Sequence, residues 1–263
     1  MEESLKGILL GSIQGLTEFL PISSTGHLVL ARKWLGLSEA GLLFDTLMHL
    51  GTFFAVLAVF LREIKEVLSH PFSPLTKLLV AGTIPTALIG FLFADFFDRI
   101  AVTGESLGWE FLFTGGILWA ADHLRERGKK RMEEMGIMDA LWIGTLQGAA
   151  ILPAISRSGL TLAGALFIGM EKEEAARFSF LLSIPSILGA NLFLPLLELS
   201  RTHHVESVGF LPLILGGLTS FLTGYLAIRW MLNLLKRGSL KGFALYVWCL
   251  GGGILLLQWS GHW

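Results

Sequence analysis

Two short polar segments, each opening with a proline, interrupt an otherwise apolar chain of 263 residues. Glu18 lies just before the first segment, and Arg157 lies inside the second. An ionisable side chain at the centre of a membrane helix costs about 2.5–3.5 kcal/mol on insertion scales, so such residues usually mark a function. The two charges therefore predict a functional site, and a purely structural ion pair between Glu18 and Arg157 is the alternative.

Hydroxyl side chains and glycines surround both charges. A helix that begins after such a segment directs backbone N–H groups and the positive end of its dipole at an anion. The planar guanidinium of Arg157 suits phosphate oxygens. Since serine and threonine runs alone more often hydrogen-bond the local backbone, the signal is their coincidence with Arg157. The sequence predicts an oxyanion or phosphate site whose binding residues are Ser23, Thr25, Gly26, Ser156, Ser158 and Thr161.

Acid–base and nucleophilic chemistry is available in the first segment. His27 follows Ser24 by three residues, close enough for a nucleophile–base relation, although a structural histidine is the alternative. Glu18 could orient His27 or hold a divalent cation, Mg²⁺ or Ca²⁺, on a phosphate group. Gln14, one helical turn earlier, could add a neutral oxygen ligand. One carboxylate does not make a protein-only metal site, so the cation would share oxygens of the substrate and water.

Two further polar pairs are expected to be structural. Asp45 and His49 share one face of a predicted span, at positions i and i+4, and Asp122 and His123 end another. For both pairs we expect packing or contact with the membrane interface in preference to chemistry.

Composition fixes the class of protein. Hydrophobic residues make up 53% of the chain and charged residues 16%, where a soluble domain carries about 25% charged residues. A soluble enzyme is thereby excluded, and the net charge of −1 argues against nucleic acid as a partner. The single cysteine, Cys249, permits no intrachain disulfide and no metal cluster. The N-terminus does not resemble a cleavable signal peptide.

The fold class predicted is an all-α polytopic membrane protein with six transmembrane helices and two re-entrant helical hairpins. The spans are expected at Leu42–Leu61, Leu75–Phe97, Trp109–Leu124, Phe178–Leu197, Val208–Leu234 and Gly242–Trp259. The third stretch, Trp109–Leu124, has the weakest sequence signal for a span. Ile8–Leu20 and Ile137–Leu152 are too short or interrupted to span and run into the two polar segments. We interpret each as the first half of a hairpin lining a protein-walled cavity, with a proline-kinked full span as the alternative.

Basic residues set the orientation. If the Arg62–Lys77 loop is cytoplasmic, 14 lysines and arginines lie on that side and 5 on the other, with Arg157 inside the membrane. This predicts that both termini and the first hairpin lie outside and that the second hairpin enters from the inside. The Arg125–Arg131 cluster is expected to attract anionic lipid headgroups.

The chain also repeats itself. Gly11-Ser-Ile-Gln14-Gly15 recurs as Gly144-Thr-Leu-Gln147-Gly148. Thr83-Ile-Pro-Thr86 recurs as Ser183-Ile-Pro-Ser186, without the same spacing. A hairpin followed by three spans must invert when repeated, and inverted repeats with broken helices build sites inside membranes. We expect one integral-membrane domain, residues 1–263, with repeats at about 1–133 and 134–263.

The motifs resemble those of the undecaprenyl pyrophosphate phosphatase family, the membrane enzymes associated with bacitracin resistance. The signature (E/Q)xxxE followed by PxSSTGH is matched by Gln14-Gly-Leu-Thr-Glu18 and Pro21-Ile-Ser-Ser-Thr-Gly-His27. The signature PGxSRSxxT is matched by Pro153-Ala-Ile-Ser-Arg-Ser-Gly-Leu-Thr161. Phe44-Asp45 with His49-Leu-Gly-Thr52, and Phe178-Ser-Phe180 before Ile184-Pro185, also resemble family segments, so the likeness covers nearly the whole chain.

Two positions depart from the family pattern. Gln14 stands where Glu is frequent, which weakens a two-carboxylate metal site. Ala154 replaces the glycine of the second signature and restricts the backbone before Ser156 and Arg157.

The resemblance implies hydrolysis of a C55 polyprenyl pyrophosphate to its monophosphate, which recycles the carrier lipid for cell-wall synthesis. It also implies six spans with two re-entrant hairpins, and a site open to the periplasmic or outer face of the cell membrane. Ser24 is the expected nucleophile, with His27 activating it or itself taking the phosphoryl group. Arg157 would clamp the pyrophosphate, and Glu18, with Gln14, would hold the metal or position His27.

Two alternatives stay open. Inverted repeats with broken helices are also a transporter pattern, so a polyprenyl-phosphate flippase is the rival function. The pairing of Ser24 and His27 beside Arg157 argues against it, because transport needs no nucleophile. Glycine clusters at Gly216-Gly217, Gly224 and Gly251-Gly252-Gly253 allow close helix approach, within one chain or in a homodimer.

Overall fold

The computed structural model describes residues 2–36, 42–93, 96, 100, 104–124, 128–193, 195, 209–261 and 263. Within these ranges the chain is helical, and its one β-type contact is an isolated bridge between Lys130 and Met170. The helices are α1 (Glu2–Phe19), α2 (Ser24–Trp34), α3 (Leu42–Val59), α4 (Leu61–Ser69), α5 (Pro74–Leu92), α7 (Leu107–Leu124), the 3₁₀ turn η1 (Met132–Glu134), α8 (Ile137–Ala149), α9 (Arg157–Phe167), α10 (Lys172–Ser186), the π-helical η2 (Ile187–Phe193), α12 (Phe210–Arg237) and α13 (Lys241–Trp259). The prediction of an all-α membrane protein is confirmed at this level.

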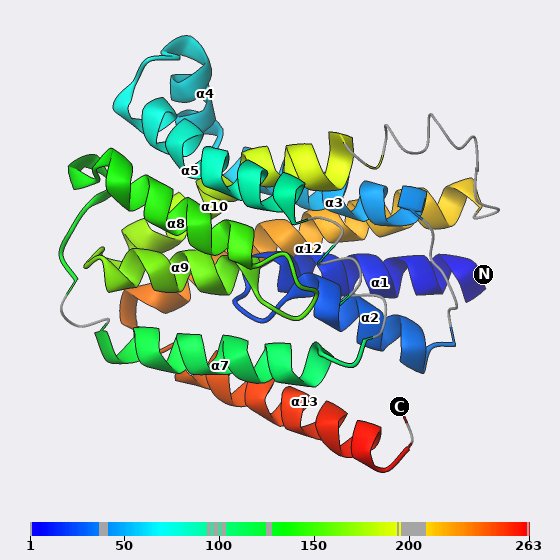
Figure 1. Ribbon diagram of the computed structural model, residues 1–263. Helices are drawn as coiled ribbons and strands as arrows, with labels where there is room; N and C mark the ends of the chain where they lie inside the picture. Colours follow the sequence, from blue (N-terminus) through cyan, green and yellow to red (C-terminus); the bar gives the residue numbers. More distant parts are fainter. Residues whose placement is uncertain are drawn as a thin grey trace.

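Each polar segment turns the chain back on itself. Helix α1 ends two residues before Pro21, and α2 begins at Ser24 with Ser23 as its N-cap, whose side chain accepts a hydrogen bond from the Gly26 N–H. Helix α9 begins in the same way, because Ser156 accepts from the Gly159 N–H. A proline follows the end of the first helix in each hairpin, two residues after Phe19 and four after Ala149, and a serine cap starts the second helix. Figure 1 shows α1 beside α2 and α8 beside α9, with the two turns meeting in the middle of the bundle.

Four helical segments are long and apolar enough to cross a membrane. They are Pro74–Leu92, Lys172–Leu192, Phe210–Lys236 and Lys241–Trp259. Helices α3 and α4 give a fifth if they count as one broken span, although they are bent by 84°. Helix α7 is not among the helices that are long and apolar enough, and it carries two buried acidic residues, Glu110 and Asp122.

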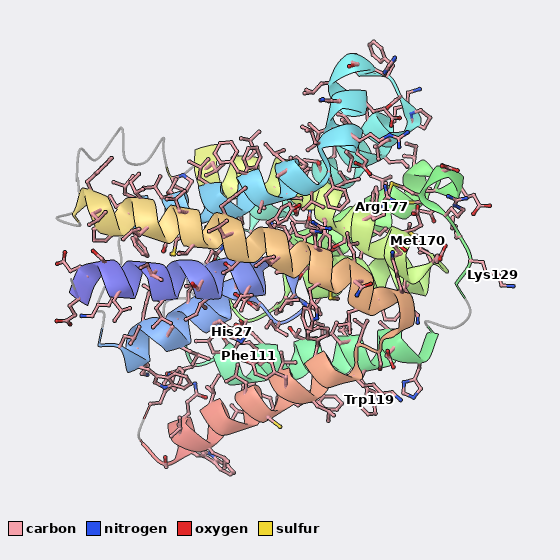
Figure 2. The ribbon with its side chains drawn as sticks, turned by 180° about the vertical axis from the view of Figure 1, so that it is seen from behind. His27, Phe111, Trp119, Lys129, Met170 and Arg177 are labelled. Carbon is pink, nitrogen blue, oxygen red and sulfur yellow. The ribbon has the colours of Figure 1, made fainter. Side chains whose placement is uncertain are left out.

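Where the structure describes them, the six predicted spans fall largely on helices, with different ends. The first ends at the bend after Val59, and the fourth begins earlier than expected, at Lys172. Phe97, Leu197 and Val208, which bound three of the predicted spans, lie outside the described residues. Arg125 and Arg127 of the basic cluster also lie outside them. Lys129 and Arg177 lie at the end of the bundle opposite the two termini, the end predicted to be cytoplasmic (Figure 2).

Helix packing follows the same scheme in the two halves of the chain. The first hairpin packs through α1 on α12, and the second packs through α8 on α5. Helices α7 and α13, the last of each half, pack on one another. In each half, the first helix of the hairpin thus packs on a helix of the other half.

The glycines of the repeated motif sit at the tightest of these contacts. A Cβ built on Gly11 would lie 2.2 Å from the Gly216 carbonyl oxygen, and one on Gly144 would lie 1.9 Å from that of Gly82. Gly216, Gly224 and Gly251 are thus in contact within one chain, whereas Gly252 and Gly253 have no neighbour within 4 Å of such a Cβ.

We expect Gly144→Ala to destabilise the protein by about 1–3 kcal/mol, because the methyl group forces α8 away from α5 at a backbone contact. Gly116→Ala in α7 is the matched control, since a Cβ there meets nothing within 4 Å. Thermal unfolding of the two variants in detergent checks this. A Gly144→Ala protein as stable as the control would contradict the close approach of α5 and α8.

Candidate active site at the meeting of the two hairpins

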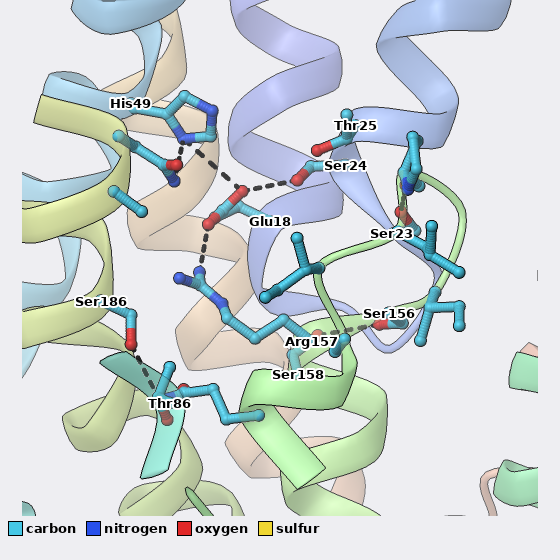
Figure 3. A pocket seen from close by; sticks show the side chains of 18 residues that line it. Glu18, Ser23, Ser24, Thr25, His49, Thr86, Ser156, Arg157, Ser158 and Ser186 are labelled. Atoms are coloured by element: carbon cyan, nitrogen blue, oxygen red, sulfur yellow. Dashed lines mark hydrogen bonds and ion pairs between the residues drawn. The ribbon is translucent and has the colours of Figure 1, made fainter. Parts of the chain in front are cut away.

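A pocket of about 190 Å³ lies where the two hairpin turns meet (Figure 3). Its walls come from both hairpins and from α3, α5, α10 and η2. The polar side chains that line it are Glu18, Ser23, Ser24, Thr25, His49, Thr86, Gln147, Ser156, Arg157, Ser158, Ser186 and Asn191. The helix starts at Ser24 and Arg157 both border the pocket, so two sets of free backbone N–H groups lie at its wall.

Glu18 is the centre of the hydrogen-bond network. One carboxylate oxygen, Oε1, accepts from Arg157 Nη2 in an ion pair across the two hairpins. The other, Oε2, accepts from Ser24 Oγ at 2.6 Å and from Gln14 Nε2 at 2.9 Å. The Glu18 side chain is 3% exposed and that of Arg157 is 19% exposed. Removing either charge therefore leaves the other partly buried and unpaired.

Ser24 and His27 face different helices. His27 Nδ1 lies 2.6 Å from the Ser23 carbonyl oxygen, and its Nε2 lies 2.8 Å from the Tyr246 hydroxyl of α13. The imidazole stacks on Tyr246 and meets Phe111 edge-on, and Figure 2 shows His27 beside Phe111. In the described part of the chain no hydrogen bond joins Ser24 to His27. The group positioned to receive the Ser24 proton is Glu18.

The predicted phosphate-binding hydroxyls divide into two groups. Ser23, Thr25, Ser156 and Ser158 line the pocket together with Ser24. Thr161 does not: its hydroxyl bonds the Arg157 carbonyl oxygen at 2.9 Å and pairs with Ser179. It holds the first turn of α9, which carries the arginine.

Gly26 serves hairpin packing. A Cβ there would lie 2.6 Å from the Phe111 ring and 3.2 Å from the Ala154 backbone, so a side chain at this position would collide with the ring and crowd the second turn.

Hydrogen bonds between the turns lock the two hairpins together. Ser23 donates to the Pro153 carbonyl oxygen, and Ser158 donates to that of Leu20 at 2.8 Å. Ser23 also has φ 70°, and it is the one non-glycine residue with positive φ among those described. That conformation is disfavoured for an L-residue, so the cross-hairpin bond and the cap of α2 hold it.

Helix α7 fixes the second turn from behind. Glu110 Oε2 accepts from the Ala154 N–H at 2.6 Å, and Thr114 Oγ1 lies 3.1 Å from the Ala154 carbonyl oxygen and 3.2 Å from the Ser156 nitrogen. Ala154 therefore replaces the family glycine without backbone strain, because its φ is negative. Glu110 could be selected from the sequence only by its charge inside a predicted span.

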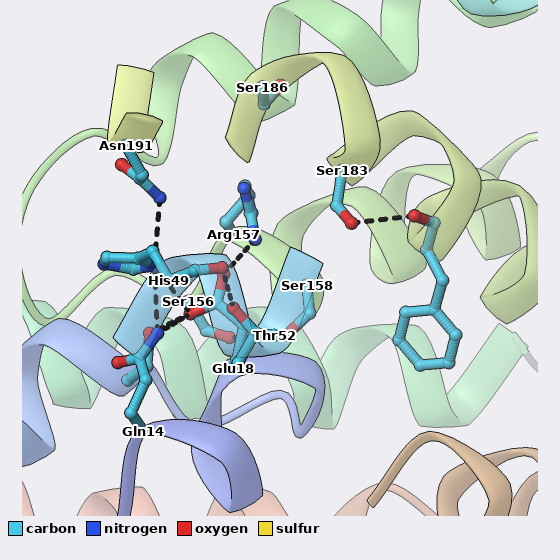
Figure 4. Close-up of polar contacts among 12 residues, drawn as sticks. Gln14, Glu18, His49, Thr52, Ser156, Arg157, Ser158, Ser183, Ser186 and Asn191 are labelled. Carbon is cyan, nitrogen blue, oxygen red and sulfur yellow. Dashed lines mark hydrogen bonds and ion pairs between the residues drawn. The ribbon is translucent and has the colours of Figure 1, made fainter. Parts of the chain in front are cut away.

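Five polar residues of the pocket were not predicted as site residues, namely His49, Thr86, Gln147, Ser186 and Asn191. His49 Nδ1 lies 3.0 Å from Gln14 Nε2, 3.2 Å from Asn191 Nδ2 and 3.9 Å from Glu18 Oε2 (Figure 4). The expected packing or interface role fits Asp45, which pairs with Arg32, but His49 lines the site. Asp122 is structural as expected, since it accepts from the Leu240 N–H at the start of α13.

A second polar cluster lies on the other side of Arg157. Gln147 Nε2 donates to Thr86 Oγ1 at 3.1 Å and to Ser186 Oγ at 2.8 Å. Thr86 and Ser186 are the last residues of the two Ile-Pro motifs. They lie in the neighbouring helices α5 and α10 and converge on the glutamine of the second repeated motif.

The protein side chains at this site supply few ligands for a metal ion. No group of three or more His, Cys, Asp or Glu side chains able to hold a metal occurs in the described ranges. Gln14 turns its amide nitrogen, not its oxygen, toward Glu18, and its Oε1 is buried without a partner. As arranged, the two residues do not form a pair of oxygen ligands.

The sequence model described as "Bacitracin resistance protein BacA" matches residues 7–253. The chain belongs to the BacA family. A protein of Carboxydothermus hydrogenoformans named undecaprenyl-diphosphatase is 48% identical over 258 residues, which cover 98% of both chains. Undecaprenyl-diphosphatase 3 of Bacillus cereus is 50% identical over 256 residues, and the undecaprenyl-diphosphatase of Halothermothrix orenii is 40% identical over 257. The family predicted from the two motifs is thereby confirmed.

Proposed function

We propose that this BacA-family protein hydrolyses undecaprenyl diphosphate to undecaprenyl phosphate and inorganic phosphate, which recycles the lipid carrier of cell-wall synthesis and gives bacitracin resistance. The observation that carries the proposal is the shared pocket of Ser24, Glu18 and Arg157 at the meeting of the hairpins. Relatives that match nearly the full length bear the name of that activity. Those names lend no support to a flippase.

Ser24 is placed to be the nucleophile. Its Oγ attacks the terminal phosphorus while Glu18 Oε2, 2.6 Å away, takes its proton. The bond from that phosphorus to the bridging oxygen breaks, and undecaprenyl phosphate leaves. Water then hydrolyses the phosphoserine and releases inorganic phosphate. Arg157 stabilises charge on the phosphoryl oxygens during both steps, aided by the N–H groups that begin α2 and α9. A role for His27 as base or nucleophile requires its ring to leave Tyr246.

The prenyl tail needs an apolar surface next to the pocket. A groove of about 450 Å³ between α4, α5 and α10 includes Ile84, Leu181 and Leu188 in its wall. The groove adjoins the pocket along the chain. Ile84 of the groove lies two residues before Thr86 of the pocket, and Pro185 of the groove directly precedes Ser186 of the pocket. We assign the tail to this groove, where it also meets membrane lipids.

The membrane layout is part of the proposal. Helices α3, α5, α7, α10 with η2, α12 and α13 form six spans, and the two hairpins are re-entrant. The exchange of partners between α1·α12 and α8·α5 supports inverted repeats at about 1–133 and 134–263. Lys129 and Arg177 lie at the end opposite the termini, which supports termini on the outer side of the membrane. The opening of the site to the periplasmic or outer face of the cell membrane is carried over from the family resemblance. A homodimer would use the unfilled surface at Gly252 and Gly253.

A divalent cation, Mg²⁺ or Ca²⁺, would be held by Glu18 together with oxygens of the diphosphate, because the pocket lacks a protein-only cage. It would supply charge neutralisation on the phosphate group. We expect chelator-treated protein to bind either cation measurably only when undecaprenyl diphosphate is present, as checked by titration calorimetry with and without the lipid. Tight cation binding by the protein alone would contradict the single-carboxylate site.

Release of inorganic phosphate from undecaprenyl diphosphate by the purified protein in detergent tests the proposed function. We expect steady release with one phosphate per lipid consumed. A folded protein that binds the lipid and releases no phosphate would contradict the enzyme and would make the flippase the better explanation of the site.

A further inference from the structure

His49 is a polar residue of the pocket that the mechanism above does not use. Its side chain is 15% exposed and lines the same cavity as Ser24 and Arg157. It reaches this position from α3, a helix outside both hairpins. Two side chains lie within hydrogen-bond distance of its ring, Gln14 on α1 and Asn191 on η2 (Figure 4).

The neighbours of His49 decide which ring nitrogen carries the proton. Both amide nitrogens, Gln14 Nε2 at 3.0 Å and Asn191 Nδ2 at 3.2 Å, approach Nδ1. An amide N–H can only donate, so Nδ1 is an acceptor. The orientation of Gln14 is fixed independently, because Nε2 also donates to Glu18 Oε2 at 2.9 Å. The flipped amide would bring its carbonyl oxygen against that carboxylate.

It follows that the hydrogen of the neutral imidazole is on Nε2. Among the described residues Nε2 has no hydrogen-bond partner, and it is not among the fully enclosed polar atoms. The pocket therefore contains an accessible N–H donor, held in orientation by two amides. Its natural partner is an anionic oxygen.

We propose that His49 is a substrate-contacting residue, whose Nε2–H donates to a phosphate oxygen of the lipid diphosphate while Gln14 and Asn191 hold the ring. This inference rests on the proposed function for the place of the diphosphate. In this proposal Gln14 and Asn191 are positioning residues. The proposal also explains why position 14 is a glutamine and not a glutamate. A carboxylate there would accept from Nδ1–H and so remove the hydrogen from Nε2.

The test compares two variants that each keep one half of the imidazole. His49→Gln places an amide N–H near the position of Nε2, and His49→Asn keeps an acceptor near Nδ1 but lacks the distal donor. We expect His49→Asn to raise KM for undecaprenyl diphosphate about tenfold or more, with kcat within about threefold of wild type. His49→Gln should restore most of this loss. His70→Asn, at the exposed end of α4, is the matched control and should leave both constants unchanged.

A second measurement separates contact with phosphate from a change in fold. Inorganic pyrophosphate serves as a competitive inhibitor, and its inhibition constant should weaken in His49→Asn by the same factor as KM. An unchanged inhibition constant, or an unchanged KM in His49→Asn, overturns the inference. Ser24→Ala is measured alongside: full activity there would overturn the proposed catalytic site itself, whereas inactive Ser24→Ala with unaffected His49 variants would overturn the inference alone.

Discussion

We expect Arg157→Ala to lower kcat/KM for undecaprenyl diphosphate by about 10²–10³-fold. The guanidinium is the one cation lining the pocket in the described part of the chain, and phosphoryl transfer develops charge on oxygens that no other side chain there can neutralise. Its removal also leaves Glu18 buried, at 3% exposure, without its ion-pair partner. Phosphate release measured over a range of lipid concentrations checks the loss.

Two further variants make this result specific. Arg157→Lys keeps the charge without the planar fork, so its rate should fall between wild type and Arg157→Ala. Arg229→Ala, on the exposed surface of α12, should retain the wild-type rate. Equal loss in Arg157→Ala and Arg229→Ala would show that general damage to the protein, not the clamp, explains the effect.

Glu18→Gln should lower kcat by about 10²–10⁴-fold, the usual range for removal of a general base. The amide has nearly the shape of the carboxylate but cannot take the Ser24 proton. It also cannot balance Arg157, so part of the loss is electrostatic. Single-turnover phosphate release at saturating lipid isolates the chemical step.

The matched control is Glu66→Gln, on the exposed side of α4, which should leave kcat unchanged. Thermal unfolding of Glu18→Gln shows whether the protein still folds. A folded Glu18→Gln protein with wild-type kcat would rule out Glu18 as the acceptor of the Ser24 proton and return the role to His27.

The helices and the two chain reversals followed from local features of the sequence. Apolar runs of membrane length indicate where helices exist, and the polar segments that begin at Pro21 and Pro153 indicate where the chain reverses. Glu18 and Arg157 stood out because an isolated charge is costly in such a chain, and the structure brings them together. The spacing alone did not show that α3 breaks at an 84° bend, since no proline or glycine marks that position.

The rest of the site depends on how helices turn toward one another. Ser24 and His27 are three residues apart on α2, yet Ser24 meets α1 and His27 meets α13, because these helices pack on different sides of α2. His49 and Glu110 lie on predicted spans that carry other polar residues as well. A span shows which residue types it carries but not which neighbour each will face. Only tertiary packing places His49 beside Gln14 and Glu110 behind the second turn.

The most direct test of the account is the rate of phosphate release from undecaprenyl diphosphate by purified wild-type, Ser24→Ala and Ser12→Ala proteins. Ser12 is the matched control, because its hydroxyl bonds only the Ile8 carbonyl oxygen of its own helix. We predict release by wild type and Ser12→Ala at similar rates, and none above background by Ser24→Ala. A folded Ser24→Ala protein that releases phosphate at the wild-type rate would contradict the assignment of hydrolysis to this pocket's serine.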